Sequence, residues 1–378
     1  MKVLICCDSF KDSLSAKEVC TTISQQINQR CTSCDVVELP MADGGEGTAL
    51  ILSEYKGAKK INTETTDAIG RRIEAPIFLT DNGECFLDVA LASGLEILNH
   101  NERDPALTSS FGTGILIRKA IELGAETFYI GLGGSATNDG GMGLLSGLGY
   151  RFFDSSNNEL IPIGGNLINL SRIEKPFDFC PDNYSFKILS DVENTLLGPT
   201  GATRTYAPQK GASDDMIEFL EEGMANFQMI CDKFFRTSYG GNPGSGAAGG
   251  IGYGILTFLN GKIEPGAEVV LNLSQFRKHL EDAGLVITGE GRLDHQTAHG
   301  KLVHRIALHA KQKNVPTIAL CGMVDANKKD INRLGLTKAF QITPPNTPLE
   351  EALHYAKRNL KLATEQVVTE FLKSSDLN

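Results

Sequence analysis

The chain opens with a pattern of hydrophobic and polar positions that is typical of a parallel α/β sheet. The apolar run from Lys2 to Cys7 predicts a buried strand. After a polar turn, apolar residues at helical spacing predict a helix from Ala16 to Arg30, with Ser15 as a candidate N-cap. The segment from Asp35 to Leu39 predicts a second strand. A strand, a helix and a strand in this order indicate a parallel sheet with ligands at the carboxyl ends of its strands.

The pattern changes in the middle of the chain and then returns. From Lys60 to Val89, polar and apolar residues alternate through turn signals, which predicts antiparallel strands. At Leu285 the strand and helix pattern resumes, and it ends in a long helix predicted from about Leu349 to Leu372. We therefore predict an α/β protein whose Rossmann-like, doubly wound domain is formed by residues 1–66 plus 285–378. Residues 67–284 are predicted to form a large inserted α/β domain, with the active site in the interdomain cleft.

Composition narrows the classes of partner. The chain has 378 residues, enough for two domains that each bury a core. Its formal net charge of -10 argues against a nucleic acid or an acidic membrane as partner, whereas local lysine and arginine side chains still permit an anionic metabolite. No apolar run reaches the roughly 18 residues that span a bilayer. The oligomeric state is left open.

The nine cysteines are scattered along the chain, and no signal peptide is apparent at its start. We therefore expect a reducing, cytoplasmic location. Cys31 and Cys34 form a C-x-x-C pair without a second pair or a nearby histidine, so the sequence favours neither a zinc site nor a redox role there. His295 and His299 are expected to be helix-entry and solvated residues rather than a metal pair.

Four glycine-rich segments that carry carboxylates indicate the chemistry. Bare backbone lets N–H groups approach a polyanion closely, and the neighbouring carboxylates can hold a cation or accept a proton. This combination predicts phosphate chemistry. The segments run from Met41 to Thr48, from Gly131 to Gly143, from Gly244 to Gly254 and from Thr288 to Thr297.

Two alternative roles for the glycine loops stay open on the residues alone. The loop that begins at Gly131 fits a G-x-G-x-x-A dinucleotide fingerprint, with Asp154 about 20 residues further on, which would suit an NAD-dependent oxidoreductase acting on a small hydroxy acid. Tight packing of a helix on a sheet would also select glycine, although it gives no reason for Asn138. A P-loop is excluded, because no Gly-Lys pair has the required surroundings.

Charged residues next to the predicted strand ends supply candidate ligands. Asp8, Ser9 and Lys11 lie on the first turn from strand to helix, where they either bind one small polar ligand or cap the helix. Asp191 ends another predicted strand, and it either binds a ligand or has a turn or cap role.

The last glycine segment carries charges of both signs. Glu290, Arg292 and Asp294 follow the predicted strand at Leu285 and offer two metal ligands and one phosphate clamp on a single loop. Such a loop is often only solvated, but its place after a buried strand favours a functional role.

Nine segments, taken together, are more specific than any single glycine pattern. They are DSFKDSLSA, LPMADGGEGT, ASGLEIL, TSSFGTG, IGLGGSATNDGGMGLLSGLG, SDVENTLLGPTGA, YAPQKGAS, GSGAAGGIGYG and VITGEGRLDHQTAHGK. In this order, from residue 1 to about residue 345, they resemble the bacterial glycerate kinase family, of the type that phosphorylates the 2-hydroxyl of glycerate. The resemblance implies a Rossmann-like domain with an inserted domain, and the conversion of ATP with Mg²⁺ and D-glycerate into ADP and 2-phosphoglycerate.

A few positions depart from the family motifs. Cys7 stands where the first motif usually has a proline, and Ser190, Glu193 and Thr195 replace other residues in a later motif. The polar residues of these motifs are otherwise intact. The effect of the departures on affinity is not predicted.

Glycerate and its reacting hydroxyl are assigned to the charged turns. We expect a cation and backbone N–H groups to hold the glycerate carboxylate, and an acid to accept the 2-hydroxyl proton. The substrate-binding candidates are Asp8, Ser9, Lys11, Gly44, Gly45 and Arg292. The catalytic candidates are Asp191, Asp43 and Lys11, with Asp191 or Asp43 as the proton acceptor.

The ATP phosphates and Mg²⁺ are assigned to the glycine loops and to three acids. The nucleotide-binding candidates are Gly133, Gly134, Ser135, Asn138, Gly246 and Gly249. The metal-binding candidates are Asp191, Glu290 and Asp294. A non-catalytic metabolite sensor is the third class considered, and it is disfavoured because the acids are all present.

Overall fold

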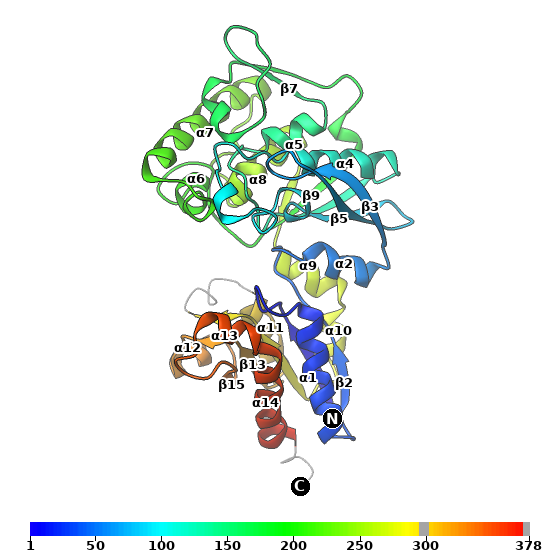
Figure 1. Cartoon of the computed structure of the whole chain (residues 1–378). Helices are drawn as coiled ribbons and strands as arrows, with labels where there is room; N and C mark the ends of the chain where they lie inside the picture. The colour runs from blue at the N-terminus through cyan, green and yellow to red at the C-terminus, as the bar shows by residue number, and fades with distance from the viewer. Residues whose placement is uncertain (295–301, 373–378) are drawn as a thin grey trace. The chain divides into compact units, whose positions relative to one another are not determined.

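The structure is a computed structural model that describes residues 1–294 and 302–372 (Figure 1). It divides into two compact units: unit 1 is Met1–Asp43 with Ala267–Asn378, and unit 2 is Gly44–Gly266. The predicted mixed α/β class is confirmed. The units change after Asp43 and Gly266, whereas the predicted boundaries are 66 and 285. The first boundary comes earlier because helix α2 (Thr48–Lys56) and strand β3 (Lys59–Thr66) pack with the strands of unit 2.

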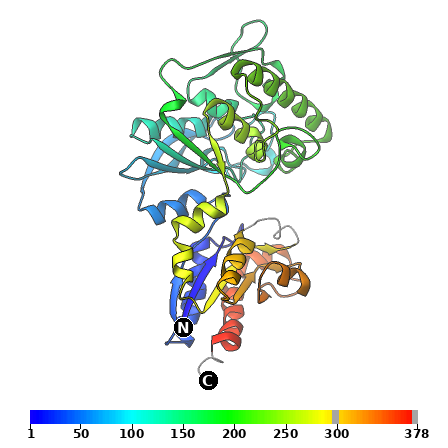
Figure 2. The ribbon, with the colours of Figure 1, turned by 180° about the vertical axis from the view of Figure 1, so that it is seen from behind.

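Unit 1 contains a five-stranded parallel sheet. Its order is β15 (Lys338–Gln341), β13 (Thr317–Cys321), β11 (Leu285–Gly289), β1 (Lys2–Cys7) and β2 (Asp35–Glu38). Strands β1 and β11 lie side by side although they are far apart in sequence, with Cys7 paired to Gly289 (Figure 2). The chain continues from β1 to one side and from β11 to the other. In open α/β sheets, ligands bind at the carboxyl ends of the strands where the order reverses in this way.

Helices cover both faces of the unit 1 sheet. Helix α1 (Ala16–Arg30) begins at Ser15, which forms a capping box with Glu18, as the predicted N-cap requires. Helices α1 and α14 (Ala356–Val367) pack against each other and share one hydrophobic core with the strands (Figure 1). Helix α11 (Leu302–Gln312) packs on β11 and β13 and contributes to a second core.

The other elements of unit 1 are short. The predicted long C-terminal helix is instead two helices, because the helical backbone breaks at Tyr355. They are α13 (Leu349–His354) and α14, and a π-helical turn, Val368–Leu372, follows. The remaining elements are α9 (Gly266–Leu273), α10 (Phe276–Leu280), α12 (Lys328–Arg333), β12 (Arg292–Leu293) and β14 (Met323–Val324).

Unit 2 contains a six-stranded mixed sheet. Its order is β10 (Lys262–Glu264), β9 (Ser185–Leu189), β6 (Thr127–Gly131), β5 (Glu84–Asp88), β4 (Arg72–Leu79) and β3. The first four strands are parallel, and β4 pairs antiparallel with both β3 and β5, which confirms the predicted antiparallel segment. The register places Asp88, Gly131 and Leu189 side by side at the carboxyl edge.

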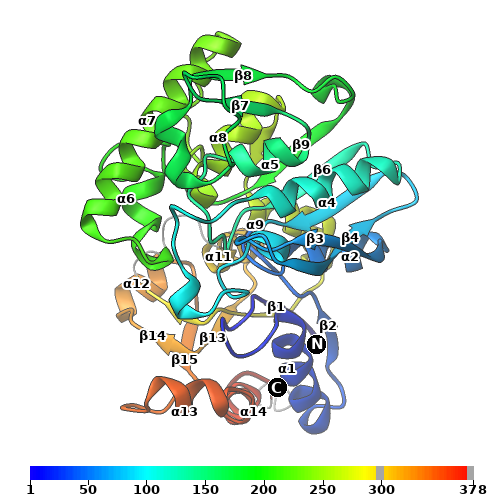
Figure 3. The same ribbon diagram turned by 45° about the horizontal axis from the view of Figure 1, so that its top comes forward.

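Helices and one small sheet complete unit 2. Helix α4 (Phe111–Glu122) packs on α5 (Met142–Gly147) and on β3. Strands β7 (Arg151–Phe153) and β8 (Arg172–Glu174) pair antiparallel in a separate two-stranded sheet (Figure 3). The other helices are α3 (Ala90–Ser93), α6 (Ala202–Tyr206), α7 (Asp214–Phe235) and α8 (Ala247–Phe258). A single large core joins these helices to the sheet, with the rings of Phe152, Phe227 and Phe258 at its centre.

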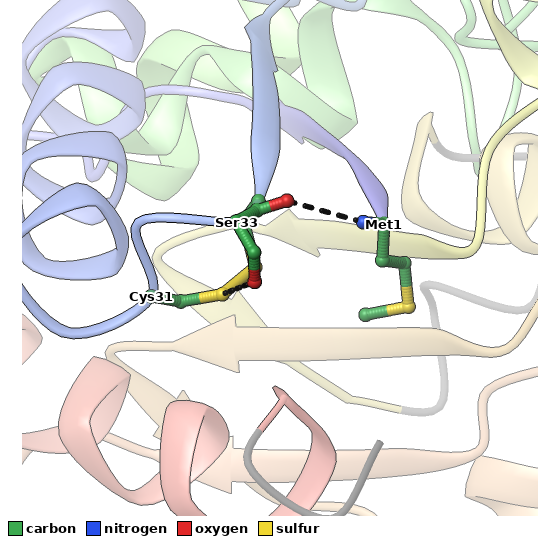
Figure 4. The surroundings of a disulfide bond; sticks show 4 residues. Met1, Cys31 and Ser33 are labelled. Carbon is green, nitrogen blue, oxygen red and sulfur yellow. Dashed lines mark hydrogen bonds between the residues drawn. A yellow bond between two sulfur atoms is a disulfide. The ribbon is translucent and has the colours of Figure 1, made fainter. Parts of the chain in front are cut away.

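The turn between α1 and β2 holds a disulfide that the sequence analysis did not predict. Cys31 and Cys34 are bonded, with their Cα atoms 5.6 Å apart, a separation within the range that disulfides need. The amino group of Met1 donates to the carbonyl of Ser33 in the same turn at 3.3 Å (Figure 4). The other cysteines are free. Within the described residues, every helix is too short or too polar to cross a bilayer.

Candidate active site

Three acids gather at the carboxyl edge of the unit 1 sheet, and we call Asp8, Asp43 and Glu290 the acidic edge. Asp8 follows β1, and its N–H donates to the carbonyl of Gly289 at 2.9 Å. Glu290 follows the neighbouring strand β11 directly. The charges of Asp43 and Glu290 both act on the Asp8 carboxylate. The parallel pairing of β1 with β11 therefore brings together residues that lie far apart in the sequence.

Burial and neighbouring charges both act on Asp8. Asp8 is half-buried, and loss of water followed by repulsion from Asp43 raises its pKa well above the usual range for an aspartate. Glu290 raises the pKa further, although the Ser9 N–H, 2.6 Å from the carboxylate, opposes this effect. Like charges held this closely favour the binding of a proton or a cation.

The cationic candidates of unit 1 lie on the same loops. Lys11 is exposed on the turn after β1, and a Cβ added to Gly291 would lie 3.6 Å from the Lys11 backbone nitrogen. Arg292 is exposed and pairs with Asp325 at 2.9 Å and with Asp294 at 3.7 Å. Arg292 is therefore already partly neutralised. His295 and His299 lie outside the described residues.

The predicted metal ligands do not form a ready-made cage. Glu290 belongs to the acidic edge, Asp294 lies beside Arg292, and Asp191 belongs to unit 2. Among the described residues, no group of three or more histidine, cysteine, aspartate or glutamate side chains could hold a metal ion by itself.

Two glycine loops pack together at the carboxyl edge of the unit 2 sheet, and we call Gly44–Gly47 with Gly131–Ser135 the glycine platform. A Cβ on Gly133 would lie 2.5 Å from the Cα of Gly45, and one on Gly44 would lie 2.7 Å from the carbonyl oxygen of Leu189. No real Cβ tolerates such contacts. The structure thus brings together Gly44, Gly45, Gly133 and Gly134. Glycine is required at Gly133 because the two loops touch there, and at Gly44 because its backbone touches the end of β9.

Asp88 fixes the first loop of the platform. Its buried carboxylate accepts hydrogen bonds from the N–H groups of Gly47 at 3.0 Å and Ala49 at 3.1 Å, at the start of α2. Burial raises the pKa of Asp88 to about 7, partly opposed by these two hydrogen bonds and reinforced by the charge of Glu46. The sequence analysis missed Asp88, although a carboxylate that ends the apolar strand β5 was a usable signal.

The second loop of the platform exposes backbone donors. The carbonyl of Gly134 accepts from the Leu95 N–H, and the Ala136 N–H donates to Ser93, both at 2.8 Å. Within residues 1–294 and 302–372, the N–H groups of Gly133, Gly134 and Ser135 have no acceptor. Consecutive unpaired N–H groups of this kind suit an anion.

The remaining nucleotide-binding candidates lie in packing positions. Asn138 is fully buried, and its side-chain amide donates to Thr203 at 3.1 Å. A Cβ on Gly249 would lie 2.0 Å from the carbonyl oxygen of Thr137, and one on Gly246 would lie 2.2 Å from a backbone oxygen of the Asp191–Pro199 loop. Tight packing therefore accounts for both glycines, and Asn138 is shielded from solvent.

Asp139 shapes the long loop from inside. It accepts hydrogen bonds from the N–H and the hydroxyl of Ser110, both at 2.7 Å, and from the N–H groups of Gly141 and Gly143, both at 3.1 Å. Asp154, the acid that a dinucleotide fingerprint would need, instead closes the exposed turn after β7 through the N–H groups of Ser156 and Asn158.

Asp191 lies two residues beyond β9, at the same edge as the platform. It is half-buried, and a Cβ on Gly44 would lie 3.1 Å from the nitrogen of the preceding Ser190. The loop that follows is held by Asn194, which donates to the Thr200 carbonyl and accepts from the Tyr206 hydroxyl, both at 2.7 Å. Asp191 thus joins the platform from a third strand.

Lys210 is a second residue that the sequence analysis missed. It lies at the end of a short 3-10 helix, Pro208–Lys210, and its side chain is buried beneath the platform. The ammonium donates to the Ser135 hydroxyl at 3.0 Å and to the Thr137 carbonyl at 2.7 Å. Its place in the motif YAPQKGAS was the available signal.

Known proteins resemble this chain over nearly its whole length. The model of the glycerate kinase family matches residues 3–372. The chain is 37% identical to a glycerate kinase of Bacillus subtilis (strain 168), over 97% of each chain, and 36% identical to the glycerate 2-kinase of Escherichia coli (strain K12), also over 97% of each. A crystal structure assigned as a glycerate kinase 2 from Salmonella typhimurium LT2 superposes with a TM-score of 0.85 at 36% identity, and covers 100% of both chains. These matches give no support to the oxidoreductase alternative.

Proposed function

The chain belongs to the glycerate kinase family, and we propose that it transfers a phosphoryl group from ATP to the 2-hydroxyl of D-glycerate. A kinase family implies a nucleotide substrate, and we propose that this nucleotide is ATP, bound with Mg²⁺. One observation carries the proposal in this chain: the unpaired N–H groups of Gly133, Gly134 and Ser135 lie against the loop that begins at Gly44. Phosphoryl transfer asks a protein mainly for such fixed donors and for in-line positioning.

The acidic edge supplies the proton acceptor in our proposal. Asp43 is the last residue of unit 1 and Gly44 the first of unit 2, so the acidic edge and the glycine platform are consecutive in one segment of chain. Asp43 accepts the 2-hydroxyl proton, with Asp191 as the other candidate, while Lys11 or Arg292 holds the glycerate carboxylate. Asp8 and Ser9 complete the substrate site.

The residues present fit Mg²⁺ in their donor chemistry. Carboxylate oxygens are the ligands that Mg²⁺ prefers, and it is usually held by one or two carboxylates together with substrate phosphates, so a cage of three acids is unnecessary. One or more of the three predicted ligands, Asp191, Glu290 and Asp294, would hold it. When bound, Mg²⁺ neutralises charge on the phosphates.

The phosphates of ATP bind the glycine platform in our proposal, through Gly133, Gly134 and Ser135. Gly246, Gly249 and Asn138 act indirectly, because they pack behind the loop. The Rossmann-like assignment of unit 1, the two-domain boundaries, the interdomain cleft and the cytoplasmic location remain predictions.

The proposed reaction is tested by incubating the protein with ATP, Mg²⁺ and D-glycerate and following the products by phosphorus NMR. We expect 2-phosphoglycerate and ADP, and neither in samples that lack the protein or D-glycerate. The 3-isomer would keep the kinase and refute the assigned hydroxyl. ADP with free phosphate and no phosphoglycerate, from a folded sample, would refute the acceptor.

A further inference from the structure

Lys210 is a charged side chain in an unusual place. It is 2% exposed, although lysine is rarely buried to this degree unless it is paired with an acid. Its ammonium makes two hydrogen bonds, to the Ser135 hydroxyl and the Thr137 carbonyl. An ammonium has three donors, and in the described part of the chain the third has no acceptor.

The surroundings do not neutralise this ammonium. Burial lowers the pKa of Lys210 to about 7, and the charge of Asp139 opposes the shift without forming an ion pair among the described residues. Asp139 is itself satisfied by the Ser110, Gly141 and Gly143 donors. On the same loops, the Arg103 carbonyl packs against Gly211, the residue after Lys210, and the Glu46 carboxylate lies near Gly134.

The loop above Lys210 also carries unsatisfied polar atoms. The hydroxyl of Thr137 and the side-chain carbonyl of Asn138 are fully buried and have no hydrogen-bond partner in the described residues. Ser135 accepts from Lys210 and so keeps its own hydroxyl hydrogen for another acceptor. Buried polar groups without a partner are uncommon in folded proteins and need an explanation, of which a bound ligand is one.

We propose that Lys210 is a positioning residue for nucleotide phosphate, which it acts on through Ser135 and through its own charge. Its two hydrogen bonds hold Ser135 and Thr137 so that three backbone N–H groups and the Ser135 hydroxyl converge on one phosphate. This role rests on the proposed function, because it requires that ATP binds the glycine platform.

The role makes phosphate binding sensitive to the protonation of one buried group. The free protein holds the Lys210 proton weakly, and a phosphate above the loop stabilises the charged form. Binding of ATP with Mg²⁺ should therefore take up a proton above about pH 7. Above this pH, the affinity for ATP should decrease by up to about tenfold per pH unit, because binding is linked to the uptake of one proton.

The experiment is calorimetry of ATP with Mg²⁺, without glycerate, from pH 6 to pH 9 in two buffers of different ionisation enthalpy. The variants are Lys210→Met, Ser135→Ala and Lys187→Met, the last removing another lysine of unit 2 that bonds to Tyr129 rather than to the platform. Lys210→Met should weaken binding at pH 7 by about tenfold or more and abolish the proton uptake. Ser135→Ala should weaken binding less and keep the uptake. Lys187→Met should match the wild type.

The outcomes separate this inference from the proposed function. If the wild type binds ATP and a folded Lys210→Met protein shows the same affinity and proton uptake, the inference is wrong and the kinase assignment stands. If the wild type does not bind ATP at all, the nucleotide assignment itself is wrong. Should Lys210→Met fail to fold, the wild type still decides, because an affinity that is constant between pH 7 and pH 9 would overturn the inference.

Discussion

The acidic edge of unit 1 and the glycine platform of unit 2 both lie where parallel strands end, but the first consists of carboxylates and the second mainly of glycine backbone. The acidic edge presents three carboxylates, and loss of water at Asp8, followed by the charges of Asp43 and Glu290, raises the pKa of Asp8. The glycine platform presents backbone N–H groups, with Asp88 and Lys210 buried beneath it and the exposed carboxylate of Glu46 beside Gly134. In our proposal, the acidic edge binds a proton or a cation, and the glycine platform binds the phosphates of the nucleotide.

This difference predicts how each edge fails. The acidic edge works through charge, so a substitution that keeps the shape of a side chain and removes its charge should impair function with little loss of stability. The glycine platform works through close backbone contact, so an added methyl group should be enough to disturb it. Substitutions of these two kinds can therefore test the assignment of each edge separately.

The largest effect is expected from removal of the proton acceptor. Asp43→Asn at the acidic edge, or Asp191→Asn beside the glycine platform, should lower kcat by about 100-fold to 10,000-fold, the usual contribution of a positioned general base. Whichever substitution has this effect assigns the base to its edge. Steady-state kinetics with ATP, Mg²⁺ and D-glycerate measures it.

Asp12→Asn is the matched control, because it makes the same chemical change on an exposed residue of the turn after β1. Asp12 has a φ of 60°, a backbone conformation that asparagine also accepts readily. Its kcat should equal that of the wild type. Near wild-type turnover in both Asp43→Asn and Asp191→Asn would show that neither acid accepts the proton.

The buried charges of the platform should appear in the pH dependence of stability. Because the folded pKa of Asp88 is raised to about 7, its contribution to stability is fully present below about pH 4 and is lost as the pH rises through 7. Asp88→Asn should therefore gain stability relative to the wild type by up to roughly 4 kcal/mol between pH 4 and pH 8. Denaturant unfolding at several pH values measures the difference. A difference that is constant with pH would mean that Asp88 is ionised throughout.

Much of the fold could be predicted from local patterns. Strand β1, helix α1 with its Ser15 cap, and the antiparallel segment were all readable, because each follows from periodicity or from turn residues within a short window. The unit boundaries differ because they depend on which sheet β3 joins, and alternation along a strand does not identify its neighbour.

The sequence allowed us to predict which types of residue form the site, but not how they are arranged. Glycine loops and acids could be identified as candidates, yet the grouping of Asp8 with Glu290 depends on the pairing of β1 with β11. Gly133 and Gly249 look alike in sequence, whereas only the structure shows that one borders unpaired N–H groups and the other packs against Thr137. Lys210 escaped notice because burial, not residue type, makes it exceptional.

A smaller effect is expected when a methyl group is added to the platform. Gly133→Ala would place its Cβ 2.5 Å from the Cα of Gly45, and its φ is not left-handed, so space alone decides the outcome. Overpacking of this kind costs about 1–3 kcal/mol, which corresponds to roughly a 5-fold to 150-fold rise in KM for ATP if the strain falls on the phosphate site.

Gly241→Ala is the matched control for this substitution, since nothing lies within 4 Å of its Cβ position and its φ is also ordinary. It should leave KM for both substrates and the melting temperature unchanged. An unchanged KM for ATP in Gly133→Ala would show that the packing of the two loops is not needed for nucleotide binding.

The smallest effect should come from the opposite edge of the unit 1 sheet, where neither kind of site is expected. Helix α1 returns from the carboxyl end of β1, so its last residue, Arg30, lies toward the amino edge, where it pairs with Glu365 of α14 at 2.6 Å. Both side chains are about a third exposed, and such ion pairs contribute roughly 0.2–1 kcal/mol. Arg30→Ala should therefore lower the unfolding free energy by less than about 1 kcal/mol and leave kcat and both KM values unchanged. A change in kinetics would mean that function extends beyond the carboxyl edge, and the contrast between the acidic edge and the glycine platform would no longer locate the site.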